Sequence, residues 1–453
     1  MMRKRKSMLA ILLAAIMVIG AAGCGKNGDV PDKKDDPQGG GIVYNEETEK
    51  SELSTKDYGG RTFKFLYWYE PSEYVYRKVA TFNAVYNANV EIVVKTGLKD
   101  TLAKAVAGGE TYDIIAMHGN YYPNLITADL LEPLDSYIAE VDMFDSEHPE
   151  NGGFSETVIN SFRFNGQTYA VGGASAVYNY ILCYNKLLFE QAGLEDPYEL
   201  YQNGEWTWDK FYEMGTSVTD IANQMGFLEA PGLYEWLVWN CVEPVSYNSS
   251  DNIFAENLSS NTLVEAVRLY QNMIIGEDPI CVTGVVGDPF NAGKEYMKMV
   301  VTDAYSSIAS QVASSTAFGK DAANLGVVPV PVAPLNESGK QPGHAPQGYA
   351  ASKGCSDPSV AACYALFESR LTDTNTGEEN QLPSEIRKAI ETDFSINGFL
   401  TQSGLSDSSG QTITDILNKE MRVSILKGGD VAAILNANRS VFERLINDAM
   451  AGN

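Results

Sequence analysis

The sequence predicts an α/β fold with mostly parallel, doubly wound sheets, divided into more than one domain. Strand patterns alternate with helix patterns from residue 61 onward, which is typical of parallel sheets covered by helices on both faces. At 453 residues the chain is also longer than one ordinary domain. No internal repeat is visible, so a solenoid is not expected.

The first predicted sheet begins at residues 61–68, where apolar side chains alternate between two faces. A helix is predicted to open at Pro71, because proline suits the first helical position. Further along we expect strands at 90–95 and 112–117 and helices at 98–107 and near 121–127. Ligands of such sheets bind beyond the carboxyl ends of the strands, which selects the loops with Trp68, Tyr69, Glu70 and His118.

Capping residues define two helices in the middle of the chain. Asn185 is a good N-cap and Gly193 a good residue after the helix end, so residues 186–192 are predicted to be helical. Thr207 caps a longer predicted helix, whose apolar residues run to Met225 and which is expected to stop at Gly226. The last helix is clear, and these residues line one face of it: Val431, Ile434, Leu435, Asn438, Phe442, Leu445, Ile446 and Ala449.

The N-terminus predicts export and a lipid anchor. Four basic residues precede a short apolar stretch over residues 8–22, which is typical of a secretion signal rather than a membrane span. Ala21-Ala22-Gly23-Cys24 resembles a lipobox, so we expect a signal peptide at 1–23 and diacylglycerol on Cys24. An ordinary signal peptide cut after Gly23 and an uncleaved anchor are the alternatives. Residues 24–56 are polar and are expected to form a flexible tether.

Charge and cysteine content exclude several classes of partner. Asp plus Glu number 59 against 33 Lys plus Arg, and a net charge of −26 argues against nucleic acid and anionic lipid headgroups as ligands. Net charge does not by itself select a cationic solute. Five cysteines besides Cys24 are expected to be mainly buried and free, with one disulfide between Cys241 and Cys281 as the alternative.

Motifs for catalysis and metal binding are missing from the sequence. It contains no G-x-S-x-G and no H-E-x-x-H, and the three histidines are far apart. No C-x-x-C spacing supports structural zinc, and we expect no metal or cofactor. Two nearby carboxylates would suffice for a glycosidase, so counting acids does not exclude that class.

Several short motifs resemble one protein family. NGQTYAVGG at 165–173, YNKLLFEQAGL at 184–194 and WTWDKF at 206–211 follow one another as in the bacterial extracellular solute-binding proteins of ABC importers, the maltose-binding-protein-like family. Gly172-Gly173 stands where that family usually has proline. The resemblance implies a type II periplasmic-binding-protein fold, with a ligand cleft between two lobes. It places the first lobe at 57–172 plus 299–348 and the second at 173–298 plus 349–453.

Aromatic and polar side chains together predict a carbohydrate site. Sugar rings stack on aromatic planes, while carboxylates, amides and imidazole bind their hydroxyl groups. We expect ligand contacts from the predicted loop residues and from positions near the lobe crossings: Trp68, Tyr69, Glu70, His118, Tyr178, Asn179, Trp236, Asp303, Tyr305 and Tyr349. Burial in the core is the alternative for Trp68, and Trp236 and Trp239 share the spacing of a core stripe.

The resemblance implies a monomeric, non-enzymatic protein on the outer face of the bacterial cytoplasmic membrane. It would capture a sugar or oligosaccharide by hinge closure and deliver it to the transmembrane subunits of an ABC permease. Two other classes stay open. One is a surface lipoprotein that hydrolyses glycans, and the other is a ligand-binding sensor or adhesin with the same fold.

Overall fold

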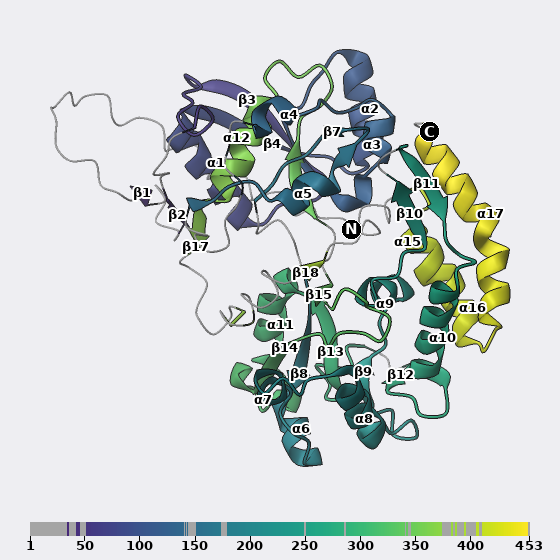
Figure 1. Cartoon of the computed structure of the whole chain (residues 1–453). Coiled ribbons are helices and arrows are strands. Elements are labelled where there is room, and N and C mark those ends of the chain that lie inside the picture. The colour runs from purple at the N-terminus through teal and green to yellow at the C-terminus, as the bar shows by residue number, and fades with distance from the viewer. Residues whose placement is uncertain are drawn as a thin grey trace, which may run out of the picture. The chain divides into compact units, whose positions relative to one another are not determined.

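The computed structural model describes residues 34–35, 42–45, 51–139, 141, 143, 151–173, 179–248, 251–284, 287–339, 341–342, 346–373, 382–383, 386, 394–395, 405–406 and 410–451 (Figure 1). All of them belong to one compact unit, Lys33–Asn453. The predicted signal peptide and the predicted lipidation site, Cys24, lie outside the described residues. No helix of the described part is both long and apolar enough to cross a membrane.

A four-stranded sheet forms the first half of the fold, in the order β16-β5-β3-β4. Its parallel strands are β3 (Arg61–Tyr67), β4 (Ala88–Val94) and β5 (Ile114–His118), and β16 (Gln347–Ala350) joins antiparallel to β5. Helices α1 (Glu73–Tyr86) and α12 (Ser359–Glu368) pack together with this sheet around Phe65 and Phe82. Leu66 joins the core cluster that contains the buried residues of α2 (Leu98–Gly108), which is the doubly wound arrangement that the sequence predicts.

A five-stranded sheet forms the second half, in the order β12-β9-β13-β8-β14. It contains β8 (Tyr180–Asn185), β9 (Gly226–Glu229), β12 (Cys281–Val282), β13 (Glu295–Val301) and β14 (Leu325–Pro329). The pairs β12–β9 and β9–β13 are parallel, whereas β8 runs antiparallel to both β13 and β14. This sheet is therefore mixed rather than mostly parallel, because the chain enters it through a strand that runs against its neighbours.

Four of the described helices flank the five-stranded sheet, and they appear with it in the lower half of Figure 1. They are α6 (Lys186–Ala192), α7 (Pro197–Gln202), α8 (Trp208–Val218) and α11 (Tyr305–Val312). Ile181 and Cys183 of β8 share one core cluster with Ile308 of α11, whereas Leu182 shares the other with Phe211 of α8. Helices therefore cover both faces of this sheet as well.

The remaining large elements form a helical layer. Helix α17 (Val431–Met450) contacts α10 (Asn261–Ile275), α16 (Arg422–Leu426) and the hairpin of β10 (Val245–Asn248) and β11 (Ile253–Glu256). Helix α9 (Leu233–Trp239) packs on the π-helix Ile416–Met421, which follows α15 (Ile413–Asp415). Ile434 and Asn438 are only half-buried, but the other predicted apolar positions of α17 lie in the core.

The smaller elements connect these layers. Short helices are α3 (Asn124–Thr127), α4 (Asp135–Ile138) and α5 (Glu156–Ser161), and short strands are β1 (Lys34–Asp35), β2 (Ile42–Tyr44), β6 (Arg163–Phe164), β7 (Gln167–Thr168), β15 (Gln341–Pro342), β17 (Leu371–Asp373) and β18 (Phe394–Ser395). Single 3₁₀ turns lie at Gly119–Tyr121, Thr302–Ala304, Thr316–Phe318 and Ala322–Asn324.

The capping residues predict both ends of α6 correctly, but they predict only the start of α8. The side chain of Asn185 accepts from the backbone N–H groups of Leu187 and Leu188, and Gly193 ends α6 with positive φ. Helix α8 begins after Thr207 as predicted but ends at Val218 instead of near Gly226. Its C-terminal neighbours form a turn closed by Asp220 and Met225, and Gly226 starts β9. Helix α1 similarly begins at Glu73, two residues after Pro71.

Part of the predicted tether is folded, which corrects its extent. Ile42, Tyr44 and Leu53 are buried, although they are isolated apolar residues in a polar stretch. Strand β2 pairs with β17, and the ring of Tyr44 stacks on Phe367 with centroids 5.2 Å apart. A few apolar side chains therefore suffice to attach this segment to α1 and α12.

Sheet membership also differs from the predicted lobe ranges. Residues 299–329 include β14 and part of β13, and both strands pair within the five-stranded sheet. Strand β16 is the next strand of the four-stranded sheet, so the chain returns there between Pro329 and Gln347. The predicted start of the second lobe's last part at residue 349 is therefore also wrong, because the end of β16 and helix α12 pack with the four-stranded sheet. In the five-stranded sheet, β13 lies between β8 and β9, and β14 lies on the other side of β8. The chain therefore forms both strands before it leaves this sheet.

The five described cysteines are free, and the alternative disulfide between Cys241 and Cys281 is not formed. Burial raises the pKa of the Cys183 and Cys363 thiols to about 12, so both stay protonated at neutral pH. These residues act as small apolar side chains in the core.

Replacing Tyr44 with alanine tests the folded part of the predicted tether. We expect Tyr44→Ala to lower the free energy of unfolding by about 3 kcal/mol, because it leaves a cavity beside Phe367 and removes the contact of its hydroxyl with Tyr86. Urea unfolding of the protein from Gly25 onward measures this change. Tyr69→Ala, at a position that is 45% exposed, is the control and should alter stability by less than about 0.5 kcal/mol. Equal effects of the two changes would contradict the docking of β2.

Candidate ligand-binding site

Aromatic side chains gather at the carboxyl edge of the four-stranded sheet. Trp68 follows β3, and its ring centroid lies 4.5 Å from Tyr69, 6.1 Å from His118 and 5.9 Å from Tyr121. Because β3 and β5 are parallel, their carboxyl ends meet at one edge and bring these four residues together. Trp68, His118 and Tyr121 are half-buried and Tyr69 is exposed, so the group presents ring surface to solvent.

Polar groups border this aromatic cluster. Glu70 is exposed and accepts a hydrogen bond from the Tyr76 hydroxyl at 2.8 Å. The N–H of Gly119 donates to the carbonyl of Pro346, which holds the loop after β5 against the start of β16. Burial lowers the pKa of His118 to about 4, so its imidazole is neutral at physiological pH and can both donate and accept.

The five-stranded sheet brings other predicted residues to its own carboxyl edge. The N–H of Thr302, directly after β13, donates to the carbonyl of Asn179 at 2.9 Å, and the N–H of Asn179 donates to the Thr302 hydroxyl. Asn179 lies there because β8 is antiparallel to β13, so the start of β8 meets the end of β13. Asn179 is almost fully buried.

The loop after β9 lies at this same edge and is held by the C-terminal helices. The side chain of Asn418, in the π-helix, accepts from the N–H of Tyr234 at 2.9 Å and donates to Glu235 Oε2 at 3.2 Å. The Tyr270 hydroxyl donates to the carbonyl of Pro231 at 2.7 Å and accepts from Arg422 Nε. Glu235, in the first turn of α9, and Asn418, in the π-helix, are both half-buried, so each side chain is partly accessible to solvent.

Trp236 and Tyr349 are corrections to the predicted ligand set. Trp236 is fully buried and donates through Nε1 to the carbonyl of Ala266, since α9 turns this face toward α10. Tyr349 is buried between Phe65 and Tyr364, and its hydroxyl donates to Glu368. Both side chains belong to the core, where aromatic rings with one satisfied polar group are stable.

Two other predicted positions, Tyr305 and Asp303, lie at or near the five-stranded edge. Tyr305 is the first residue of α11 and is 7% exposed, and burial raises its pKa to about 12. Asp303 lies in the 3₁₀ turn Thr302–Ala304 directly after β13. Tyr178 lies outside the described residues.

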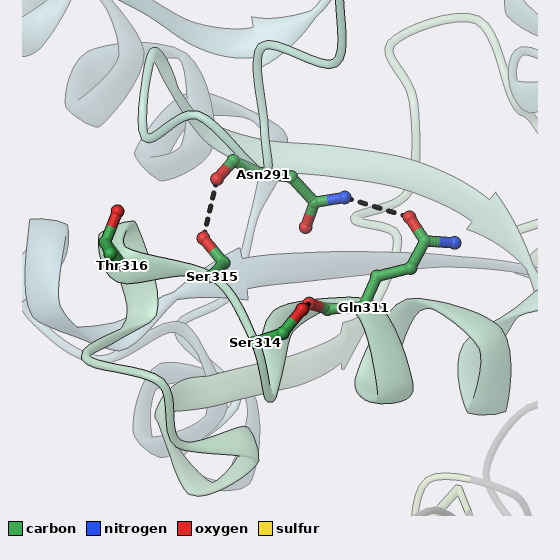
Figure 2. Close-up of a pocket in the computed structure, with 5 residues that line it drawn as sticks. All are labelled: Asn291, Gln311, Ser314, Ser315 and Thr316. Carbon is green, nitrogen blue, oxygen red and sulfur yellow. Dashed lines mark hydrogen bonds between the residues drawn. The ribbon is translucent and has the colours of Figure 1, made fainter.

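A separate polar pocket lies at the opposite edge of the five-stranded sheet, away from the carboxyl ends of β9 and β13. Figure 2 shows its lining residues, Asn291, Gln311, Ser314, Ser315 and Thr316. Asn291 precedes β13 and Ser315 precedes β14, and these two strands run in the same direction, so the pocket is at their amino ends. It has no aromatic lining. We therefore place the candidate solute site at the carboxyl edges instead.

Sequence reasoning missed Tyr121, Tyr234, Glu235 and Asn418. Tyr121 is only three residues after His118, so the strand-end rule could have included it. Tyr234 and Glu235 lie in the first turn of α9, directly after the loop that follows β9. They were missed because the helix predicted through residues 219–225 left strand β9 unpredicted, so the strand-end rule was not applied there. No local signal marks Asn418, because its role depends on packing against a loop that is 184 residues away from it in the chain.

Among the described residues, no group of three or more His, Cys, Asp or Glu side chains is arranged to hold a metal ion. The two carboxyl edges instead offer aromatic rings, carboxylates, a neutral imidazole and a side-chain amide. Such groups can bind a hydroxyl-bearing solute by stacking and hydrogen bonding.

Acid titration tests the environment of His118. Its pKa is near 6.5 in the unfolded chain and about 4 in the folded protein, so the unfolded state takes up the proton first as the pH falls. Stability is therefore retained above about pH 7 and lost as the pH falls to 4, by up to about 3 kcal/mol from this group. Between pH 7 and pH 4 the free energy of unfolding of His118→Gln should therefore fall by up to about 3 kcal/mol less than that of the wild-type protein. Urea unfolding at each pH measures both values. Parallel curves for the two proteins would show that His118 is not buried in this way.

Solved structures of several solute-binding proteins have a fold similar to that of this chain. The GacH receptor of Streptomyces glaucescens, known unliganded and with acarbose, has a TM-score of 0.58 at 17% identity over 86% of this chain and 99% of that chain. UgpB of Mycobacterium tuberculosis, in complex with glycerophosphocholine, also has a TM-score of 0.58 at 17% identity, over 85% and 98% of the two chains. An extracellular solute-binding protein of Staphylococcus aureus, in complex with maltose, has a TM-score of 0.57 at 14% identity over 86% and 96%.

The sequence itself identifies the family. No curated protein matches the chain. The family model for bacterial extracellular solute-binding proteins matches residues 69–362, which is more than half of the chain. The chain has the two-lobed α/β fold of the periplasmic binding proteins and is a member of the bacterial extracellular solute-binding protein family.

Proposed function

We propose that this protein captures a sugar or oligosaccharide outside the cell and delivers it to an ABC permease. The observation that supports this proposal is the aromatic cluster of Trp68, Tyr69, His118 and Tyr121 at the strand ends. Glu70 and the neutral His118 supply hydrogen-bonding groups beside those rings. Ring faces and polar groups at one edge suit the alternating apolar and hydroxyl faces of a sugar.

We propose that the second half of the fold completes the site. Its carboxyl edge carries the loop with Glu235 and the side chain of Asn418, which supply polar contacts rather than further ring surface. A ligand held on the aromatic cluster would then be covered when the two halves close, and the closed form would be the one that the permease binds. Three of the similar structures contain acarbose, maltose and mannotriose, which supports a saccharide.

The hydrolase alternative has less support. The family and the similar structures are binding proteins, and the candidate carboxylates Glu70 and Glu235 lie on different sheets' edges. Among the described residues, Glu70 hydrogen-bonds to Tyr76 and Glu235 to Asn418, and neither carboxylate is hydrogen-bonded to a histidine or a second acid. A sensor or adhesin would use the same site, and only the permease partner distinguishes it from a transport protein.

Thermal unfolding with a panel of mono- and oligosaccharides tests the ligand class. A sugar that binds only the folded state stabilises it by about 2.7 kcal/mol at a hundredfold excess over its Kd. We expect a raised midpoint with a saccharide that chromatography recovers intact. Recovery of shortened sugars would favour the hydrolase, and the lack of a shift with every sugar would refute the saccharide proposal.

Trp68→Ala tests whether the aromatic cluster is the sugar platform. Loss of the stacking surface should weaken the binding of that sugar at least about tenfold in titration calorimetry. Tyr212→Ala is a matched control, because Tyr212 is a half-buried aromatic residue on α8 whose hydroxyl binds Asp278 away from the strand ends. Unchanged affinity in the Trp68 variant would remove the cluster from the site.

Cys24→Ser tests the proposed lipid anchor on the outer face of the cytoplasmic membrane. Serine lacks the thiol that takes diacylglycerol, so we expect the variant in the soluble exported fraction instead of the membrane fraction. Cys241→Ser, at a free cysteine of the folded unit, is the control and should stay with the membrane. Membrane retention of the Cys24 variant would argue against lipid attachment at this residue.

A further inference from the structure

The first turn of α9, which follows the loop after β9, carries an acidic group that is hydrogen-bonded to the π-helix. We infer that Glu235, braced by Asn418, determines the charge of the accepted ligand, so that the site takes neutral and amine-bearing saccharides and rejects those with carboxylate or phosphate groups. This inference rests on the proposed sugar-binding function. It adds a ligand charge class, which the family membership does not supply.

Glu235 is held by a hydrogen bond from a side chain that is itself oriented. It lies in the first turn of α9, and its Oε2 accepts from Asn418 Nδ2 at 3.2 Å. Asn418 is itself oriented, because its Oδ1 accepts from the N–H of Tyr234 at 2.9 Å. A side chain in place of Gly232 would put its Cβ 2.0 Å from Glu235 Oε2 and 2.8 Å from Asn418 Nδ2. Glycine at this position therefore leaves the space that the carboxylate occupies.

The cations nearest to this group in the chain have other partners. Arg422 donates to the Tyr270 hydroxyl, and Lys419 forms an ion pair with Asp415. Glu229, at the end of β9, is instead neutralised by Lys298 at 2.9 Å. Within the described part of the chain no ion pair holds Glu235, although the charges of Arg422 and Glu235 both act on the Tyr270 hydroxyl.

The described loops at the same edge add no positive charge. The residues after β9, β13 and β14 are 230–232, 302–304 and 330–339, and none of them is Lys or Arg. At the edge of the four-stranded sheet, Glu70 is acidic and His118 is neutral, while Lys95 follows the outermost strand β4. Among the described residues, the side chains of the aromatic cluster and of these loops are therefore neutral or negative, while Arg422, bound to the Tyr270 hydroxyl beside Pro231, is a cation next to the loop after β9.

This arrangement separates ligands by charge rather than by shape. A hydroxyl group can donate to the Glu235 carboxylate, and an ammonium group gains a charge-assisted hydrogen bond there. A carboxylate or phosphate would lose its hydration and face a like charge at Glu235, to which no cation is paired among the described residues. The simple structural role of Glu235, which is to stabilise the first turn of α9, does not predict any dependence on ligand charge.

The experiment uses sets of sugars that share one ring and differ in a single neutral, amino or carboxylate substituent. The probes are glucose, glucosamine and glucuronate, the same sets built on mannose and galactose, and the corresponding β-1,4-linked disaccharides, each titrated into the protein from Gly25 onward by calorimetry. We expect the neutral or amino sugar of the best-binding set to bind at least about tenfold more tightly than its uronate counterpart. Higher salt should reduce this ratio, because it screens the repulsion.

Glu235→Gln keeps the size and hydrogen-bonding capacity of the side chain but removes its charge. We expect it to reduce the ratio of neutral to uronate affinity about tenfold, and to weaken the amino sugar relative to the neutral one. Asn418→Ala, which removes the brace, should shift both ratios in the same direction by a smaller factor. Glu213→Gln, at an exposed glutamate of α8, is the charge-matched control and should leave both ratios unchanged.

The outcomes separate the two proposals. Tight binding of a uronate by the wild-type protein, or unchanged ratios in the Glu235 variant, would overturn the charge selection while leaving the sugar-binding function intact. Failure of every probe, whatever its charge, would overturn the sugar-binding function and the inference with it. A loss of stability in Glu235→Gln without any change in the ratios would show that Glu235 has only a structural role.

Discussion

Strand direction is the constraint on which the candidate site depends. Parallel strands end at one edge of a sheet, so β3 and β5 place Trp68 and His118 next to each other although 50 positions separate them in the sequence. In the five-stranded sheet, β8 runs against its neighbours and therefore contributes its first residues, near Asn179, to the edge where β13 ends. The same rule assigns the polar pocket beside Asn291 to the other edge, away from the candidate site.

The two edges differ in chemistry, and this difference suggests a division of roles. The four-stranded edge presents ring surface from Trp68, Tyr69 and Tyr121, whereas the five-stranded edge presents Glu235 and Asn418. Aromatic surface supplies affinity for many sugars, because stacking is tolerant of the pattern of hydroxyl groups. An oriented carboxylate supplies discrimination, because its interaction depends on the charge and the position of the ligand group.

The C-terminal helices belong to this site as much as to the core. The π-helix Ile416–Met421 contains Asn418, and π-helical turns occur frequently at functional sites because they reposition a side chain. Arg422 and Tyr270 hold the carbonyl of Pro231 from the same side. The position of the loop after β9 thus depends on contacts with a segment nearly two hundred residues further along the chain.

By itself, the sequence determined the α/β class, the strands and helices of the first half, the α6 caps and the Trp68–His118 edge, because these depend on local periodicity, capping and strand direction. The family followed from short motifs. Only the tertiary structure decided that Trp236 and Tyr349 are core residues, because the face that a helix or strand buries depends on its packing partner. Tertiary packing also decided that Ile42 and Tyr44 dock as part of a strand, that residues 299–329 belong to the five-stranded sheet, and that Asn418 holds Glu235. Each of these depends on a contact between distant segments, for which a single sequence carries no local signal.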